Sequence, residues 1–488
     1  MQFPRSSGIL LHPTSLPGPF GVGDLGDESY RFADFLAKAG LHIWQVLPLS
    51  PTGYGESPYQ SLSSFAGNPL LISLEKLADR GYLAARDLED TPVFPDDIVD
   101  FANVIPFKIK LLRKAFGSFR SSAEFEEFCE RERAWLDDFS RFMALKSANG
   151  QKAWTDWSNH EADPQEIELQ KFWQWEFHRQ WDELKSYCRS RGVRMMGDIP
   201  IYVAHDSADV WSNPDLFELN PDGQPAKMSG VPPDYFSATG QLWGNPIYRW
   251  DRMQATGYKW WIERFRATLR VVDMVRLDHF RGFEGYWEVP AGESTAINGR
   301  WVKGPGAALF EALEAALGKL PIVAENLGVI TPEVEALRHR FGFPGMSVLQ
   351  FAFGTDPQAP TFRPHNYPRE VVAYTGTHDN DTTVGWWQTQ GAGDSTRSPA
   401  DVERERDFTK AYLNSDGREI HWAFIRAVMA SVADTVIVPL QDVLGLGNEA
   451  RMNLPGSTKG NWHWRCRPNA LTPQIRDRLK QLTLLYDR

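Results

Sequence analysis

Four short apolar segments of the sequence carry, at or near their ends, a side chain that could act as an acid, a base or a nucleophile. Asp198 lies in GDIPIYV, Asp278 in VRLDHFRG, Glu325 in VAENLG and Asp379 in YTGTHDND. A single carboxylate in such a place is usually a helix cap or a surface charge. Four of them, each closing an apolar run, predict an acidic site assembled from distant parts of the chain, and a carboxylate pair flanking one bond is the machinery of glycoside hydrolysis.

The spacing within these segments indicates a role for each acid. Arg276 and Asp278 are two residues apart in an extended segment, so their side chains point to the same side. A guanidinium fixed beside Asp278 keeps that carboxylate ionised, which suits a nucleophile. Glu325 follows an apolar tripeptide, and partial desolvation next to another carboxylate would raise its pKa, as a general acid requires. Three further side chains could hydrogen-bond sugar hydroxyls: His279, His378 and Asp379.

The elements that must position these groups are predicted from hydrophobic patterning. Eight short runs, most of them rich in Val, Ile and Leu, are typical of buried parallel strands: residues 8–11, 42–48, 193–202, 271–278, 322–326, 346–353, 371–379 and 435–441. Helical patterns lie between them, including 27–39, 306–317 and 332–340. Alternating strands and helices predict an α/β fold, a (β/α)8 TIM barrel, in which catalytic residues sit at the carboxyl ends of the strands.

Two connections are too long for a simple barrel. We expect residues 1–50 and 191–488 to form the catalytic barrel, and residues 51–190 to form a mostly helical inserted subdomain between its second and third strands. A shorter insertion at about 203–270, rich in Pro, Gly, Asn and Asp, is expected to be loop and to include a lid region. Aromatic residues at 172–181 could bind glucan, although packing of the insertion onto the barrel is the favoured interpretation.

Composition excludes several classes of function. With 52 Lys and Arg against 63 Asp and Glu, the net charge of −11 disfavours nucleic acid and anionic membranes as partners. No signal peptide or membrane-spanning run is found, so a cytoplasmic protein is expected. The eleven His show no HExxH spacing and the three Cys are far apart, so no metal site is expected. No cofactor-binding motif is found. The glycine-containing segment 444–453 is interpreted as an active-site loop and not as a nucleotide site. The 19 Trp indicate either a large core or sugar stacking.

Taken in order, these segments resemble glycoside hydrolase family 77, the amylomaltases or 4-α-glucanotransferases of the α-amylase clan. The resemblance runs from RSSGILLHPTSLPGPFGVGDLG to LGLGNEARMNLPGSTKGNWHWR and includes GYGESPYQSLSSFAGNP and GVPPDYFSATGQLWGNPIYRW. It implies that Asp278 is the nucleophile, Glu325 the acid/base and Asp379 the transition-state stabiliser. It also implies substrate contacts by Ser57, Tyr59, Asp198, Trp243, Arg276, His279 and His378, and a secondary glucan site at Tyr54.

The resemblance further implies transfer of an α-1,4-glucan segment to the 4-hydroxyl of another glucan or of glucose, with retention through a covalent glycosyl-enzyme. Two alternatives remain open: an α-1,4-glucan hydrolase of the same clan, and a catalytically silent glucan-binding protein. The sequence departs from the family pattern at three positions. Asn326 stands where Asp is common and could alter the pKa of Glu325, and Ala238 stands where the lid often has Glu. Gly354 stands where an Asp often contacts the acceptor, a role that Asp356 could take over.

Overall fold

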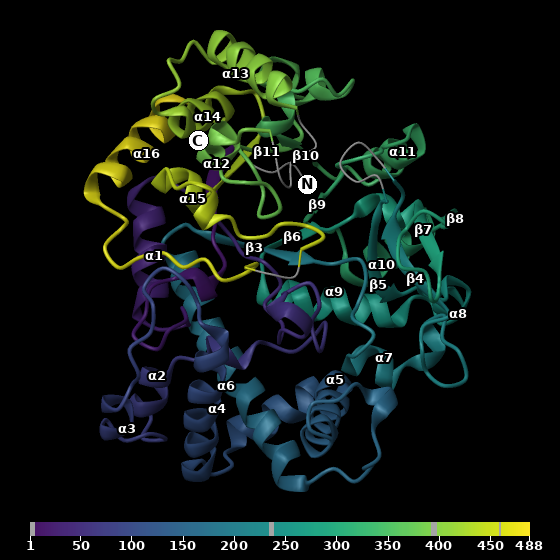
Figure 1. The fold of residues 1–488 in the computed structure, drawn as a ribbon. Coiled ribbons are helices and arrows are strands. Elements are labelled where there is room, and N and C mark those ends of the chain that lie inside the picture. The colour runs from purple at the N-terminus through teal and green to yellow at the C-terminus, as the bar shows by residue number, and fades with distance from the viewer. Residues whose placement is uncertain (1–4, 234–238, 392–397, 458–459) are drawn as a thin grey trace.

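Parallel strands form the centre of the molecule (Figure 1). The computed structural model describes residues 5–233, 239–391, 398–457 and 460–488. Within them, one eight-stranded parallel sheet comprises β1 (Ser6–Leu10), β2 (Ile43–Gln45), β3 (Arg194–Ile199), β6 (Met274–Leu277), β9 (Ile322–Ala324), β10 (Gly345–Val348), β11 (Val371–Tyr374) and β12 (Thr435–Pro439). Each lies within a run predicted to be a strand or starts within two residues of it. All eight predicted runs extend past the end of their strand, because their last residues belong to the loops.

The sheet closes on itself as a barrel. The strand order is β10-β11-β12-β1-β2-β3-β6-β9, which leaves β9 and β10 at the two edges. Across this seam the backbone N–H of Ala324 donates to the carbonyl of Pro344 at 2.8 Å. The side chain of Asn326 accepts a second bond from the N–H of Met346, also at 2.8 Å. The predicted (β/α)8 barrel is confirmed.

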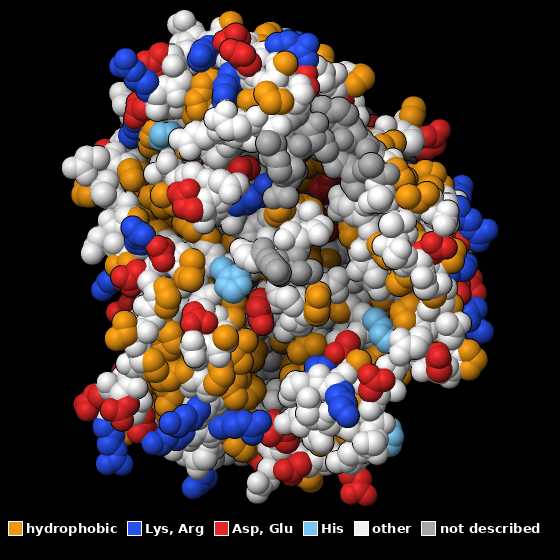
Figure 2. Space-filling view, viewed as in Figure 1, with side chains coloured by type: hydrophobic (Ala, Val, Ile, Leu, Met, Phe, Trp, Pro, Cys, Tyr) orange, Lys and Arg blue, Asp and Glu red, His pale blue; other side chains and the backbone are white. Residues whose placement is uncertain are grey.

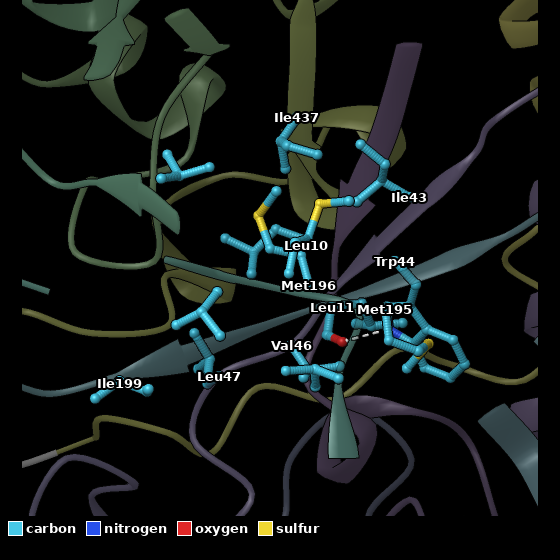
Figure 3. Close-up of a cluster of buried hydrophobic side chains, with 14 of the residues drawn as sticks. Leu10, Leu11, Ile43, Trp44, Val46, Leu47, Met195, Met196, Ile199 and Ile437 are labelled. Atoms are coloured by element: carbon cyan, nitrogen blue, oxygen red, sulfur yellow. Dashed lines mark hydrogen bonds between the residues drawn. The ribbon is translucent and has the colours of Figure 1, made fainter. Parts of the chain in front are cut away.

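Side chains alternate between the barrel interior and the helical layer, as the period of a strand requires. The hydroxyl of Tyr374 on β11 donates to Oε1 of Gln45 on β2 at 2.9 Å, a bond that crosses the interior. Trp44 points outward, where its Nε1 donates to the carbonyl of Leu11 at 2.8 Å and its ring meets the edge of Phe32. Figure 3 shows four apolar side chains from different strands lying together: Leu10, Ile43, Met196 and Ile437.

Helices cover most of the connections. They include α1 (Asp27–Lys38), α6 (Pro164–Ser190), α9 (Lys259–Val271), α10 (Ala307–Leu317), α11 (Pro332–Arg340), α12 (Thr383–Gln388), α13 (Pro399–Leu413), α14 (Ile420–Ala430) and α16 (Pro473–Leu485). The fully described connection from β10 to β11 has three 3-10 turns and no α-helix. Its sequence explains this, because the four prolines between residues 354 and 370 cannot donate the hydrogen bonds of an α-helix.

The long insertion forms the lower part of Figure 1, with α2 (Leu74–Asp79), α3 (Arg86–Glu89), α4 (Phe101–Ser118) and α5 (Ala123–Ala148). Lys108 of α4 is fully buried and anchors it: Nζ lies 3.1 Å from Oδ2 of Asp24 and donates to the carbonyls of Leu70 and Ile72. The helix α6 packs on α5 and also on α1 beside the barrel, so it fills the barrel's own helix position. The aromatic residues at 172–181 are buried and serve packing. The boundaries 51 and 190 stay a prediction.

A second, antiparallel sheet lies beside the barrel, at the right of Figure 1. Its strands are β4 (Lys227–Val231), β5 (Gln241–Pro246), β7 (Gly285–Pro290) and β8 (Arg300–Lys303), in the order β5-β4-β7-β8. The expectation that residues 203–270 are loop is therefore wrong: this segment contains β4, β5, α7 (Ala208–Ser212), α8 (Trp250–Ala255) and most of α9. One of its short strands, β4, pairs with β7, which lies far along the chain, and local patterning does not reveal such a pairing.

The surface carries mixed charge. On the face drawn in Figure 2, basic and acidic side chains of the described residues are interspersed. None of the helices in the described ranges has the length and apolar character needed to cross a membrane.

Candidate active site

The loops that follow the barrel strands enclose a large open cleft with a volume of about 1680 Å³. It is lined by segments from most of the length of the chain, including the loops after β6, β9 and β11. The residues predicted from the sequence that line it are Tyr54, Ser57, Tyr59, Trp243, Arg276, Asp278, His279, Glu325, His378 and Asp379. Asp198 lies just beneath the cleft, bonded to two of these residues.

Arg276 is the centre of a chain of charges on the floor of the cleft. Its Nη1 lies 2.6 Å from Oδ2 of Asp198, its register partner on β3, and its Nη2 lies 2.8 Å from Oδ1 of Asp278. Tyr59 donates its hydroxyl to the same Asp198 oxygen at 2.8 Å. The Arg276 and Asp198 side chains are buried, whereas that of Asp278 is 26% exposed. Asp278 is thus the member of the chain that reaches the cleft, held there by a buried guanidinium.

Glu325 occupies the corresponding place on the next strand. β6 and β9 pair with Leu277 opposite Ala324. Asp278 and Glu325 directly follow this pair at the ends of the two strands. Neighbouring strands lie about 4.8 Å apart. Two acids 47 residues apart in the sequence are therefore side by side at the same level of the barrel.

The surroundings of Glu325 adjust its acidity. Burial raises its pKa to about 7; Arg276 opposes this rise, and the charge of Asp278 adds to it. Its two carboxyl oxygens accept hydrogen bonds from the backbone N–H groups of His279 and Leu327, each at 2.8 Å, which fixes the plane of the group. The raised pKa predicted from the sequence is confirmed. A carboxyl group that titrates near neutral pH can both give and take a proton there.

An aromatic wall with a third carboxylate faces this pair. Tyr59 stacks on His378 with ring centroids 5.1 Å apart, and Trp462 lies 5.7 Å from Tyr59. Asp379 accepts a hydrogen bond from Nδ2 of Asn453 at 2.6 Å and lies 3.3 Å from Nε2 of His378. The sequence predicted an active-site loop at 444–453 but not the contribution of Asn453 within it, nor that of Trp462 nine residues beyond it. Nothing local in the sequence shows which side chains of this region turn toward the cleft.

His279 supplies a neutral hydrogen-bonding group. Burial lowers its pKa to about 3, and Arg281 adds to the effect, so the imidazole is uncharged at neutral pH. Its Nε2 is buried and has no partner among the described residues, and its ring meets the edge of Trp243 at 4.8 Å. Elsewhere in the cleft, the Oγ of Ser57 accepts a hydrogen bond from the N–H of Tyr59 and so orients the loop that carries the Tyr59 ring. An incoming hydroxyl could satisfy the open nitrogen of His279.

The loop that carries His378 and Asp379 is clamped from below by a residue that sequence reasoning missed. Asp442, in α15 (Leu440–Leu444), is buried and accepts hydrogen bonds from both ends of the loop. The donors are the hydroxyl of Thr375 at 2.5 Å and the N–H and hydroxyl of Thr383 at 2.6 and 2.8 Å. Burial raises the pKa of Asp442. The sequence feature that could have identified Asp442 is its place three residues after the end of the apolar strand β12.

The departure at Asn326 has a structural role. Its side chain bonds Met346 across the barrel seam and donates to Oε1 of Glu335 on α11 at 2.8 Å. It is directed to β10 and α11. The structure therefore gives Asn326 a role in barrel closure, and its effect on the pKa of Glu325 stays a prediction.

The departure at Gly354 lies in the lining of the cleft. A Cβ added at Gly354 would be 3.1 Å from Oε1 of Glu405, so a carboxylate from α13 already approaches this position. Asp356 lines the cleft and its Oδ1 accepts a bond from the N–H of Gln358. Ala238 lies outside the described residues. Tyr54 is 78% exposed at the rim. In the described ranges, no group of three or more His, Cys, Asp or Glu side chains could hold a metal ion.

Comparison with known proteins gives a consistent family. Residues 11–472 match the glycoside hydrolase 77 family, described as 4-alpha-glucanotransferase. The 4-alpha-glucanotransferase of Synechocystis sp. is 50% identical over 99% of this chain and 98% of its own, and that of Thermus thermophilus is 48% identical over 100% of both. The amylomaltase of Streptococcus agalactiae, solved in complex with acarbose, is similar in structure with a TM-score of 0.93, 37% identity and 99% coverage of both chains. The chain belongs to glycoside hydrolase family 77, the 4-alpha-glucanotransferases.

Proposed function

We propose that this chain transfers a segment of an α-1,4-glucan to the 4-hydroxyl of another glucan, or of glucose, by double displacement. Glu325 protonates the glycosidic oxygen while Asp278 attacks the anomeric carbon, which breaks the glycosidic bond and forms a β-linked glycosyl ester. The leaving sugar departs. The 4-hydroxyl of the acceptor then attacks the same anomeric carbon as Glu325 takes its proton, which breaks the bond to the Asp278 carboxyl oxygen and forms the new glycosidic bond. Two inversions give net retention, with an expected carboxyl separation of about 5–5.5 Å.

The observation that carries this proposal is the pairing of Asp278 and Glu325 on adjacent strands. The guanidinium of Arg276 lies 2.8 Å from the carboxylate of Asp278, and burial raises the pKa of Glu325 to about 7. One carboxylate is thus suited to attack and the other to proton transfer. In this proposal Asp379 and His378 bond the hydroxyls of the sugar undergoing substitution, and the ring of Tyr59, which stacks on His378, lies beside that sugar.

Transfer in place of hydrolysis is supported by the names of the relatives and by the shape of the site. A cleft of about 1680 Å³ accommodates sugar on both sides of the reacting bond, and a bound acceptor displaces the water that would otherwise attack. The exposed ring of Tyr54 offers a separate contact for a long glucan at the rim. The cytoplasmic location stays a prediction from the sequence.

The product pattern from maltotriose tests the proposal. We expect a ladder of longer glucans together with glucose, with little gain in reducing ends. Maltose and glucose accompanied by a steady gain in reducing ends would show the hydrolase. Asp278→Asn should abolish both patterns while glucan binding persists. Asp251→Asn, which changes an exposed carboxylate in α8 away from the cleft, is the matched control and should behave as wild type.

A further inference from the structure

An aromatic side chain outside the predicted site also lines the cleft. Trp301 of β8 is 42% exposed and is among the few large hydrophobic side chains of the described chain that lie open to solvent. The guanidinium of Arg281 lies 3.7 Å from the centroid of its ring, so one face is covered by a cation. Trp287 meets the ring edge-on at 5.2 Å. The exposed part of the indole is available to a ligand in the cleft.

The supports of this ring are themselves fixed. Arg281 is buried and donates from its side chain to the carbonyls of Gly285 and Val329. The indole N–H of Trp287 donates to the carbonyl of Ala296 at 2.8 Å, within the turn that joins β7 and β8. A rigid aromatic surface loses little conformational entropy when it binds a ligand.

Arg281 links Trp301 to the loop after β9, which begins at the proposed general acid. Arg281 follows Asp278 by three residues, and Val329, which Arg281 bonds, follows Glu325 by four. The group that protonates the glycosidic oxygen must face the departing sugar and, in the second step, the acceptor. The wall formed by Tyr59 and His378 belongs to the sugar that is attacked.

We propose that Trp301 is a stacking platform for a glucosyl residue of the acceptor chain, beyond the sugar whose 4-hydroxyl reacts. The inference rests on the proposed function and deepens it. The apolar C–H face of a pyranose ring matches an indole face. Ser294 and Thr295, in the turn between β7 and β8, also line the cleft and offer hydroxyls to a sugar. Glucose as acceptor is too short to reach this platform, whereas a maltooligosaccharide reaches it.

The test measures acceptor KM at saturating unlabelled donor, with reducing-end-labelled maltotetraose and with labelled glucose. Trp301→Leu retains an apolar cover over Arg281 but offers no flat face. We expect the KM for maltotetraose to rise about tenfold, with the KM for glucose and both kcat values within about twofold of wild type. Trp301→Phe should restore most of the affinity. Trp301→Gln replaces the leucine variant if that protein does not fold.

Phe408→Leu is the matched control. Phe408 is 39% exposed, and the guanidinium of Arg363 lies over its ring at 4.8 Å from the centroid, but Phe408 does not line the cleft. It should leave both KM values unchanged. A Trp301→Leu enzyme whose KM for maltotetraose equals that of wild type, or rises equally for glucose, would overturn the proposal. Transfer to glucose by the wild-type enzyme tests the proposed function separately, since absence of that transfer would refute the transferase itself.

Discussion

Removing the Glu325 carboxyl separates the two halves of the proposed reaction. General acid catalysis typically contributes about 10²–10⁴-fold, so Glu325→Ala should reduce kcat/KM for a maltooligosaccharide donor by about that factor. With α-maltotriosyl fluoride as donor, fluoride leaves without protonation and the first step should remain fast. Because the base of the second step is also missing, the glycosyl-enzyme should accumulate, and a fluoride electrode should record a burst of about one fluoride per active site.

The pH dependence of the wild-type enzyme follows from the same group. Glu325 acts as an acid only while protonated, and its pKa is about 7. As pH rises through that value kcat/KM for the glucan donor should fall, and at pH 8 about a tenth of the enzyme carries the proton. The first step with the fluoride donor needs no proton and should not share this fall.

Two results would refute this reasoning. One is a Glu325→Ala enzyme that loses the fluoride burst as completely as it loses activity on glucan. The other is an equal alkaline fall for both donors in the wild-type enzyme. Asp356→Asn is the control for changing a cleft carboxylate, since its side chain bonds only a local turn N–H among the described contacts. It should keep both first-step rates.

Three further changes test the supports of the site. Asp442→Ala leaves the N–H and hydroxyl of Thr383 without their buried acceptor, so urea unfolding should show a loss of about 2–4 kcal/mol, and kcat should fall with the loosened loop. Asn326→Asp replaces the Nδ2 that lies 2.8 Å from Oε1 of Glu335 by a carboxylate oxygen, so two carboxylates repel each other when both are ionised. Calorimetry should therefore give a Tm lower than that of wild type at pH 7 and near that of wild type at pH 4. Lys108→Met removes the partner of the partly buried Asp24 carboxylate and of two buried carbonyls, which should cost about 3–5 kcal/mol in denaturant unfolding.

Each of these expectations has a contradicting outcome. An Asp442→Ala protein with wild-type stability and kcat would show that the clamp does not hold the loop. A Tm difference for Asn326→Asp that is independent of pH would exclude charge repulsion at the seam. A Lys108→Met protein as stable as wild type would show that the buried ammonium is replaceable by an apolar group.

The barrel could be predicted because its strands are buried and short. Runs of Val, Ile and Leu between helical patterns marked all eight of them, and the helices at 27–39, 306–317 and 332–340 appear within a residue of the predicted ends. The seam was not predictable, since Asn326 meets Met346 only once β9 and β10 become neighbours. The antiparallel sheet was missed for the same reason: β4 and β7 are separated by more than fifty residues.

The site divides in the same way. Arg276, Asp278 and Glu325 could be named because strand ends in a barrel converge on one face, so position along the strand fixes position in space. Asn453 and Trp462 reach the cleft from an irregular loop after β12, and Asp442 acts through threonines more than 55 residues away. Such contacts depend on how loops pack against one another, which no local period encodes.

Covalent labelling of the nucleophile distinguishes the proposed double displacement from every mechanism that lacks a covalent glycosyl-enzyme. A 5-fluoro-α-glucosyl fluoride should form a slowly hydrolysed ester, and mass spectrometry of proteolytic peptides should locate one glycosyl adduct on Asp278 in the VRLDHF segment. Attachment to Glu325 or Asp379, or turnover of the reagent with no labelled peptide at any time point, would contradict the account.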